Sequence, residues 1–236
     1  MGIAERPPRE PPRAPLHWRV VSALFELLYR NRALYWVAST VPFAGQWRRW
    51  QRLVLPRLAP GATVLEVGCG IGTLIADMAA AGYTCSAVDR SPQMVAATRA
   101  RLRRRGFTAV AGRVTQAQVR ALPFADASFD AVVSTFPTDY IADPQALREI
   151  ARVLRPGGRL VVVLSASLLP TRPLVLPFVA IQTLVYGRAR SGDRPSAAGE
   201  QRPLLALLRH CGFAPRFEAV RGPFWEANLY LGEKPL

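Results

Sequence analysis

The stretch Thr63-Val-Leu-Glu-Val-Gly-Cys-Gly-Ile-Gly-Thr-Leu74 decides how the chain folds. Its apolar, β-branched first half is typical of a buried strand, and a helical pattern begins near Thr73. Three alternate glycines, Gly68, Gly70 and Gly72, join the two, where the backbone must turn sharply and a ligand can approach closely. A strand that leads into a helix through such a loop places a ligand at the carboxyl edge of a parallel sheet.

The composition is that of a folded globular protein. The chain has 236 residues, of which 50% are hydrophobic and 20% charged, and this suits one domain of moderate size. The net charge of +15 is almost entirely arginine, since Lys234 is the sole lysine. Anionic partners such as nucleic acid or phospholipid headgroups would use this charge. A GC-rich genome would also produce it, and we favour this explanation because no compact basic and aromatic recognition module is present.

The cysteines and histidines indicate no metal site. The three cysteines, Cys69, Cys85 and Cys211, lack a metal-ligand spacing, and the chain has two histidines. The first fifteen residues are rich in proline and arginine and lack the apolar segment of a secretory signal. We therefore expect a cytoplasmic location.

The sequence pattern divides the chain into three parts. Residues 1–15 are expected to form a disordered tail. Residues 16–58 are expected to form a cap of two helices, 16–38 and 43–58, whose aromatic and arginine side chains suit either a membrane interface or packing at the domain edge. Residues 59–236 are expected to form the main domain, in which 165–201 is interpreted as a lid or insertion on the substrate side.

Strands and helices alternate from residue 60 onward, which predicts an α/β fold with a doubly wound, mostly parallel sheet. We expect a Rossmann-like seven-stranded sheet with one antiparallel strand near the C-terminus, together with the N-terminal helices. Strands are expected at 63–67, 83–88, 108–111, 129–134, 159–164, 214–220 and 225–232. Helices are expected at 71–81, 92–104, 144–154, 174–186 and 203–211.

The glycine spacing distinguishes two kinds of cofactor. Dinucleotide sites use Gly-x-Gly-x-x-Gly, whereas Gly68-Cys-Gly-Ile-Gly72 is one residue tighter. Glu66 lies inside the strand before the loop. An anionic side chain there would repel a pyrophosphate and would favour a cationic ammonium or sulfonium group.

At these residues the chain resembles the class I S-adenosylmethionine-dependent methyltransferases, and in particular the branch of ubiquinone and menaquinone biosynthesis and phospholipid methylation. The resemblance covers about residues 60–164. It is carried by four segments that occur in the family's order: 64–72, 88–89, 120–133 and 151–162.

The resemblance implies that S-adenosyl-L-methionine is the cofactor. Asp89, at the end of the second strand, would bind both ribose hydroxyls. Gln118 stands where the family usually has an acidic residue that accepts from the adenine amino group, and an amide oxygen can accept the same bond. A shift of register would instead leave the backbone of Val119 to contact the ring. The residues expected at the cofactor are Glu66, Gly68, Cys69, Gly70, Gly72, Asp89, Arg90, Gln118, Val119 and Ser134.

The segment Ser134-Thr-Phe-Pro-Thr-Asp-Tyr140 should lie beside the transferable methyl group. It lacks the Asn/Asp-Pro-Pro-Tyr form of enzymes that methylate amino groups of nucleic acids. Asp139 is a candidate general base, and Tyr140 could donate a hydrogen bond to the acceptor or stack on it. Alternatively, Asp139 caps a helix and Tyr140 packs into the lid.

The sequence therefore predicts methyl transfer to a small-molecule or lipidic acceptor. An RNA methyltransferase, a non-catalytic S-adenosylmethionine-binding protein, and an aminopropyl- or cyclopropane-forming enzyme remain alternatives. An anionic membrane surface, on its cytoplasmic side, is a partner that fits the sequence better than nucleic acid does. The acceptor atom, membrane association and the choice between monomer and homodimer stay open.

Overall fold

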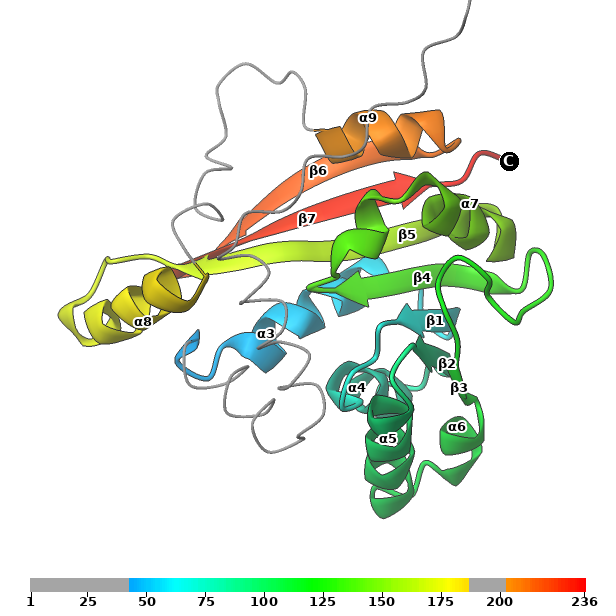
Figure 1. The fold of residues 1–236 in the computed structure, drawn as a ribbon, viewed down its shortest axis with the longest axis horizontal. Helices are drawn as coiled ribbons and strands as arrows, with labels where there is room; N and C mark the ends of the chain where they lie inside the picture. Colours follow the sequence, from blue (N-terminus) through cyan, green and yellow to red (C-terminus); the bar gives the residue numbers. More distant parts are fainter. Residues whose placement is uncertain (1–42, 187–202) are drawn as a thin grey trace, which may run out of the picture.

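The computed structural model describes residues 43–186 and 203–236 (Figure 1). The expected tail at 1–15, the expected helix at 16–38 and residues 187–201 of the expected lid lie outside the described residues.

A seven-stranded sheet runs through the domain in the order β3-β2-β1-β4-β5-β7-β6 (Figure 1). The strands are β1 (Thr63–Val67), β2 (Thr84–Asp89), β3 (Val114–Gln116), β4 (Phe129–Thr135), β5 (Leu154–Leu168), β6 (Ala214–Arg221) and β7 (Trp225–Glu233). Neighbouring strands from β3 to β5 pair in parallel, whereas β7 pairs antiparallel with both β5 and β6. The expected fold class is confirmed.

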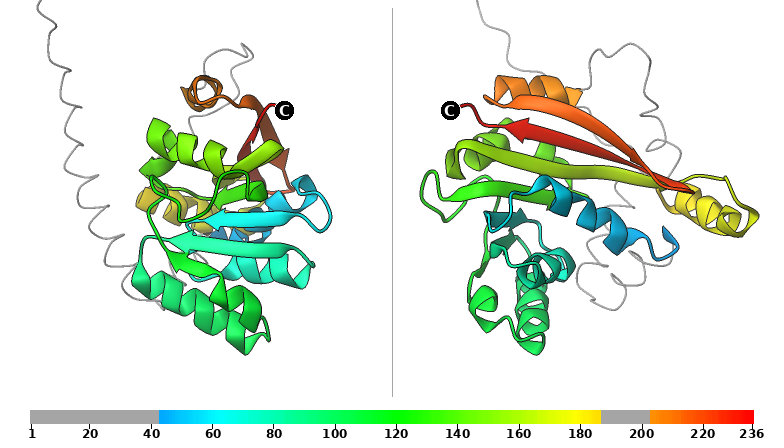
Figure 2. Two further views of the ribbon diagram at one scale, coloured as in Figure 1. Left: turned by 90° about the vertical axis from the view of Figure 1, so that its right-hand side faces the viewer. Right: turned by 180° about the vertical axis from the view of Figure 1, so that it is seen from behind.

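Helices cover both faces of the sheet (Figure 2). The helical segments are α3 (Trp47–Gln51), η2 (Arg52–Arg57), α4 (Thr73–Ala80), α5 (Pro92–Arg104), α6 (Thr108–Gly112), η3 (Asp139–Ala142), α7 (Pro144–Val153), η4 (Pro173–Val175), α8 (Leu176–Tyr186) and α9 (Pro203–His210). Buried side chains of α3, α4 and α5 form one hydrophobic cluster with the sheet, and those of α7 and α9 form another. The sheet is therefore a middle layer with a core on each side.

Strand β1 shows how the sequence specifies this layering. Val64 packs in the cluster with α4, whereas Leu65 and Val67 pack in the cluster with α7. Successive side chains point to opposite faces, so a strand covered on both sides needs an apolar residue at nearly every position. Glu66 is the exception in this strand, and a buried carboxyl at that place needs a functional explanation.

The order of the strands defines where a ligand can bind. From β1 the chain continues to β2 and β3 on one side and then returns to β4 on the other side of β1. In open sheets of this kind, ligands bind outside the carboxyl ends of the strands where the order reverses. The loop after β1 lies at this switch point.

The expected strand at 108–111 is wrong, because the segment forms helix α6. The amide of Ala111 donates to the carbonyl oxygen of Phe107 at 3.0 Å, a helical bond. Local helical bonding thus outweighs the β-preference of the threonine and valine in this segment. The third strand instead begins at Val114, where it pairs with β2.

Two further expectations need correction. The helix expected at 43–58 is a short α3 followed by the 3-10 turns of η2, which contains Pro56. A proline ring removes an amide donor and prevents a regular α-helix. Strand β5 is longer than expected, so the break placed at residue 165 comes after Leu168. The other elements lie within a few residues of their expected bounds.

Buried aromatic rings anchor α3 to the sheet. Trp50 is fully buried, and its ring centroid lies 6.3 Å from that of Phe136 and 6.3 Å from that of Trp225. Phe136 directly follows β4, and Trp225 begins β7. Helix α3 therefore packs at the carboxyl end of β4, close to the switch point.

We expect Trp50→Ala to lower the free energy of unfolding by about 3–5 kcal/mol, the usual cost of deleting a large buried aromatic side chain. Chemical denaturation followed by circular dichroism measures this change. Leu236→Ala is the matched control, because its side chain is fully exposed and its loss should cost less than about 0.5 kcal/mol. Equally small effects in both variants would contradict the anchoring role of Trp50.

Candidate functional site

The loop after β1 consists of a series of left-handed turns. Gly68, Gly70 and Gly72 have φ angles of +74°, +53° and +74°, a region that other residues rarely adopt. A Cβ atom on Gly72 would lie 2.7 Å from the side chain of Thr98 on α5. Glycine is thus required for the conformation of the loop and for the close packing of α5 behind it.

Asp89 connects the loop to the end of β2. Its Oδ2 accepts from the amide of Gly70 at 2.9 Å, and its Oδ1 accepts from the amide of Ser91 at 2.9 Å. Burial raises the pKa of the Asp89 carboxyl above its ordinary value, and the two amide bonds oppose this rise. Each carboxylate oxygen retains a lone pair, so the group can still accept from a diol at the edge of the sheet.

Glu66 is a buried carboxyl directly beneath the loop. Its side chain is 1% exposed, and within the described residues its Oε2 has no hydrogen-bond partner. Burial raises the pKa of Glu66 well above its usual range, as do the negative charges of Asp89 and Asp77, while a bond from the Ile75 amide opposes the rise. A cationic ligand at the loop would supply the missing partner, which fits S-adenosylmethionine.

Cys69 is a buried packing residue of the loop. It is buried, and its Sγ lies 3.7 Å from Oγ1 of Thr98, which also donates to the carbonyl of Gly70 at 2.7 Å. Burial raises the pKa of the Cys69 thiol well above its usual range. The thiol is therefore a neutral packing group that faces α5.

Ser134 and Tyr140 form a hydroxyl network with the end of β1. Their two oxygens lie 2.5 Å apart, and each lies 3.2 Å from the carbonyl oxygen of Val67. The Tyr140 hydroxyl would lie 2.9 Å from a Cβ atom on Gly68, so its ring covers the first glycine of the loop. The network joins the loop after β4 to the loop after β1.

Asp139 lies in the same loop as Tyr140. It is exposed and begins η3. The side chain that caps α7 is that of Asp143, which accepts from the amide of Gln145 at 2.9 Å. The structure therefore gives the helix-capping role to Asp143 and leaves the Asp139 carboxylate open to solvent at the carboxyl edge of the sheet.

The residues expected near the ribose and adenine lie at adjacent strand ends. Asp89 pairs with Gln116 across β2 and β3, and Arg90 follows it in an exposed position. Gln118 is exposed two residues beyond β3, whereas Val119 is half-buried and packs against the cluster that contains α7. The polar side chains at this edge therefore include those of Asp89, Arg90, Gln116 and Gln118.

The sequence did not indicate two features of the site. Thr98 is fully buried on α5 and bonds to the loop, although its sequence signal is only a threonine at an inward position of an amphipathic helix. On the other side, Trp47 of α3 stacks on Phe136 with ring centroids 4.0 Å apart. Phe136 has a φ of +53°, a conformation that is uncommon for a bulky residue and often marks a functional site.

Comparison with known proteins places the chain among methyltransferases. Residues 65–162 match the family model described as a methyltransferase domain. A demethylmenaquinone methyltransferase of Renibacterium salmoninarum is 38% identical over 172 residues, which cover 69% of this chain and 68% of that relative. A protein of the same name from Mycobacterium sp. (strain KMS) is 40% identical over 145 residues, covering 60% of this chain and 58% of the relative.

A solved structure shows the same fold. The 1,6-didemethyltoxoflavin-N1-methyltransferase of Burkholderia thailandensis, crystallised with S-adenosylhomocysteine, aligns with a TM-score of 0.60 at 21% identity. The alignment covers 98% of this chain and 94% of that structure. From the glycine loop, the buried acidic groups beside it, the order of the strands and these relatives, we conclude that the chain belongs to the class I S-adenosylmethionine-dependent methyltransferases.

Proposed function

We propose that this protein transfers a methyl group from S-adenosylmethionine to a small quinone-type acceptor. The observation that carries the donor half of the proposal is the buried carboxyl of Glu66 beside the glycine loop, whose Oε2 has no hydrogen-bond partner within the described residues. The relatives that are named demethylmenaquinone methyltransferases support the acceptor half. They favour a small-molecule acceptor over RNA.

The residues around the loop have separate roles in holding the donor. Glu66 would favour its cationic end, and Asp89 would accept from the two ribose hydroxyls. The amide oxygen of Gln118 would accept from the adenine amino group. When bound, S-adenosylmethionine supplies a methyl group that a positively charged sulfur activates for transfer.

The protein contributes alignment and the exclusion of water to the transfer step. The stacked rings of Trp47 and Phe136 offer an apolar surface for a planar acceptor at the end of β4. Tyr140 holds the loop after β4 against the glycine loop through its hydroxyl. Asp139, exposed in the same loop, accepts the proton that the acceptor loses.

A lipidic acceptor would be found in a membrane, so we further propose that the protein works at the cytoplasmic face of an anionic membrane. Whatever its genomic origin, the excess of arginine gives the protein a positive charge that favours contact with acidic headgroups. Within residues 43–186 and 203–236, no helix is both long and apolar enough to cross a bilayer.

Asp89→Ala should weaken the binding of S-adenosylmethionine at least about tenfold while the protein stays folded, because it removes a charge-assisted acceptor and the support of the Gly70 amide. Isothermal titration calorimetry measures the affinity, and circular dichroism verifies the fold. Asp126→Ala is the control, since that carboxylate is exposed in the loop before β4, away from the carboxyl ends of the strands. Normal binding by a folded Asp89→Ala protein would exclude the ribose assignment.

The affinity for S-adenosylmethionine should rise with pH because of Glu66. Burial raises the pKa of the Glu66 carboxyl in the free protein, whereas a cationic ligand favours the ionised form and lowers this pKa, so binding is coupled to release of a proton. The affinity stops rising once the pH exceeds the pKa of the Glu66 carboxyl in the free protein. Calorimetry in two buffers with different ionisation enthalpies measures the released proton.

Glu66→Gln is the matched variant for this measurement, because it keeps the shape and cannot ionise. Subtracting the number of protons that the variant releases on binding from the number that the unchanged protein releases removes any contribution from the ligand itself. Identical proton release in both would show that Glu66 does not respond to the cation.

Methyl transfer should be detected as label moving from S-adenosylmethionine into demethylmenaquinone supplied as its hydroquinone, because an electron-rich ring attacks an electrophilic methyl group. Mass spectrometry should show a product heavier by one methylene, and RNA should take up no label. Binding of the donor without incorporation into any acceptor of a cell extract would favour a non-catalytic binding protein. Label in RNA would favour the nucleic-acid alternative.

Asp139→Asn tests the proton acceptor within the same assay. We expect kcat to fall at least about tenfold, while the affinity for S-adenosylmethionine is unchanged. An unchanged kcat would remove Asp139 from the mechanism and leave the methyl transfer itself in place.

A further inference from the structure

The segment formed by η4 and α8 exposes apolar side chains. Leu174, Leu176 and Ile181 are 84%, 49% and 38% exposed. Among the described residues, the one other large hydrophobic side chain that is exposed to this degree is Leu236, the last residue. We call Leu174, Leu176 and Ile181 the apolar tip. A concentration of this kind on one short segment marks an interaction surface.

The fold holds the apolar tip outward. Helix α8 lies at one end of the molecule, beyond the end of β5 (Figures 1 and 2). Its Gln182 donates to the carbonyl of Ala166 at 3.1 Å and accepts from the amide of Leu168 at 3.0 Å. The amide of Leu169 also donates to the carbonyl of Phe224 at 2.8 Å. These bonds fix one side of α8 to β5 and leave the apolar side to the surroundings.

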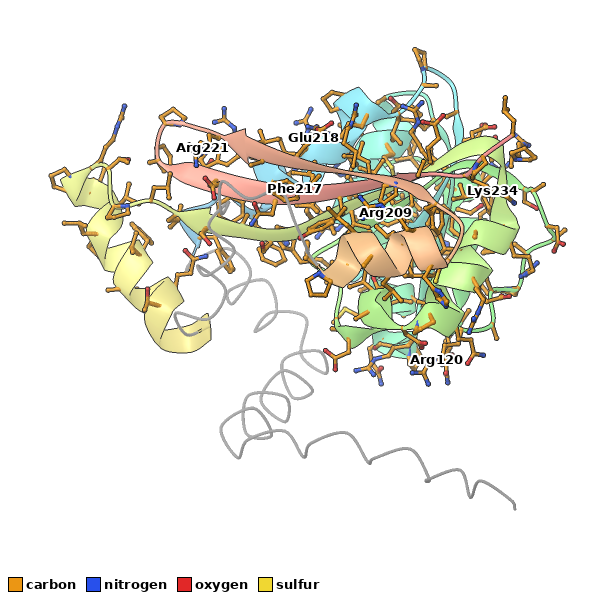
Figure 3. All side chains as sticks on the ribbon, turned by 90° about the horizontal axis from the view of Figure 1, so that it is seen from above. Arg120, Arg209, Phe217, Glu218, Arg221 and Lys234 are labelled. Carbon is orange, nitrogen blue, oxygen red and sulfur yellow. The ribbon has the colours of Figure 1, made fainter. Side chains whose placement is uncertain are left out.

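The charges around the apolar tip are positive. Residues 164–186, from the end of β5 through α8, contain no acidic residue, and their one arginine, Arg172, is exposed directly before η4. Arg221 projects from the same end of the sheet, whereas Lys234 lies at the opposite end (Figure 3). The nearby acid, Glu226, is paired with Arg221 at 2.6 Å. An apolar surface with a basic border matches the interface of an anionic membrane.

We propose that the apolar tip docks the protein on an anionic membrane, with Leu174, Leu176 and Ile181 inserted among the lipids and Arg172 at the headgroups. Helix α8 has 11 residues, whereas a helix needs about 20 to span a bilayer, so α8 lies in the interface. A second copy of the chain fits less well, because two molecules of net charge +15 repel each other. The inference rests on the proposed function only for the lipidic nature of the acceptor.

Co-sedimentation of the full chain with vesicles tests the proposal. We expect binding to vesicles of 70% phosphatidylcholine and 30% phosphatidylglycerol, and little binding to pure phosphatidylcholine. The double variant Leu174→Gln/Ile181→Gln keeps the net charge and should lower the partition coefficient at least about tenfold. Arg172→Gln should weaken binding to the anionic vesicles alone.

Leu236→Gln is the matched control, because it replaces a fully exposed leucine at the opposite end of the molecule (Figure 1). It should bind vesicles like the unchanged protein. Equal binding by the double variant would overturn the proposal, since the attraction would then be purely electrostatic. Failure of the unchanged protein to bind anionic vesicles would overturn it as well.

Two further measurements separate this proposal from its rivals. A concentration-dependent dimer that the double variant abolishes, seen by light scattering without vesicles, would assign the apolar tip to a second copy instead. Calorimetry with S-adenosylmethionine should give the same affinity for the double variant and the unchanged protein. Loss of donor binding in both would refute the proposed function, whereas failure of the unchanged protein to bind anionic vesicles, with donor binding intact, would refute only the docking surface.

Discussion

The site depends on one constraint: the backbone after β1 must make left-handed turns, and neighbouring elements must hold it there. Gly70 provides the central turn, with its amide bound to Asp89 on β2 and its carbonyl bound to Thr98 on α5. These two bonds fasten the loop to a strand and a helix that lie far from it in sequence. A ligand therefore meets a preformed backbone, and binding need not pay the entropy of ordering it.

The same arrangement places two acidic side chains close to the glycine loop. Burial makes both Glu66 and Asp89 harder to ionise, and the negative charge of Asp89 adds to the cost for Glu66. A cationic donor bound at the loop would relieve this cost. A neutral sulfur compound offers less relief, so the charge on sulfur itself contributes to recognition.

Much of the fold and of the donor site could be predicted because their signals are local. The acidic residue inside the apolar strand, Glu66, and the alternate glycines after it lie within a few positions of one another. By contrast, Tyr140 covers Gly68 and Thr98 packs behind Gly72 only through contacts between distant segments, which no local pattern specifies. The error at 108–111 has two causes, since local helical bonding outweighs the β-preference of that segment and the pairing with β2 is made by Val114–Gln116.

The switch point also divides the domain into two parts that differ in how readily their residues can be substituted. In the proposed function the donor is held on the side of β1, β2 and β3, where bonds to Gly70 leave little room for substitution. The proposed acceptor side is built from α3, the loop after β4 and the segment after β5, and it meets the donor side at the bonds of Ser134 and Tyr140 to Val67 and at the ion pair of Arg48 with Asp77. Under this assignment, mutations away from these contacts would alter the choice of acceptor and preserve the donor affinity. This separation gives a physical reason why one sheet architecture can diversify toward many acceptors during evolution.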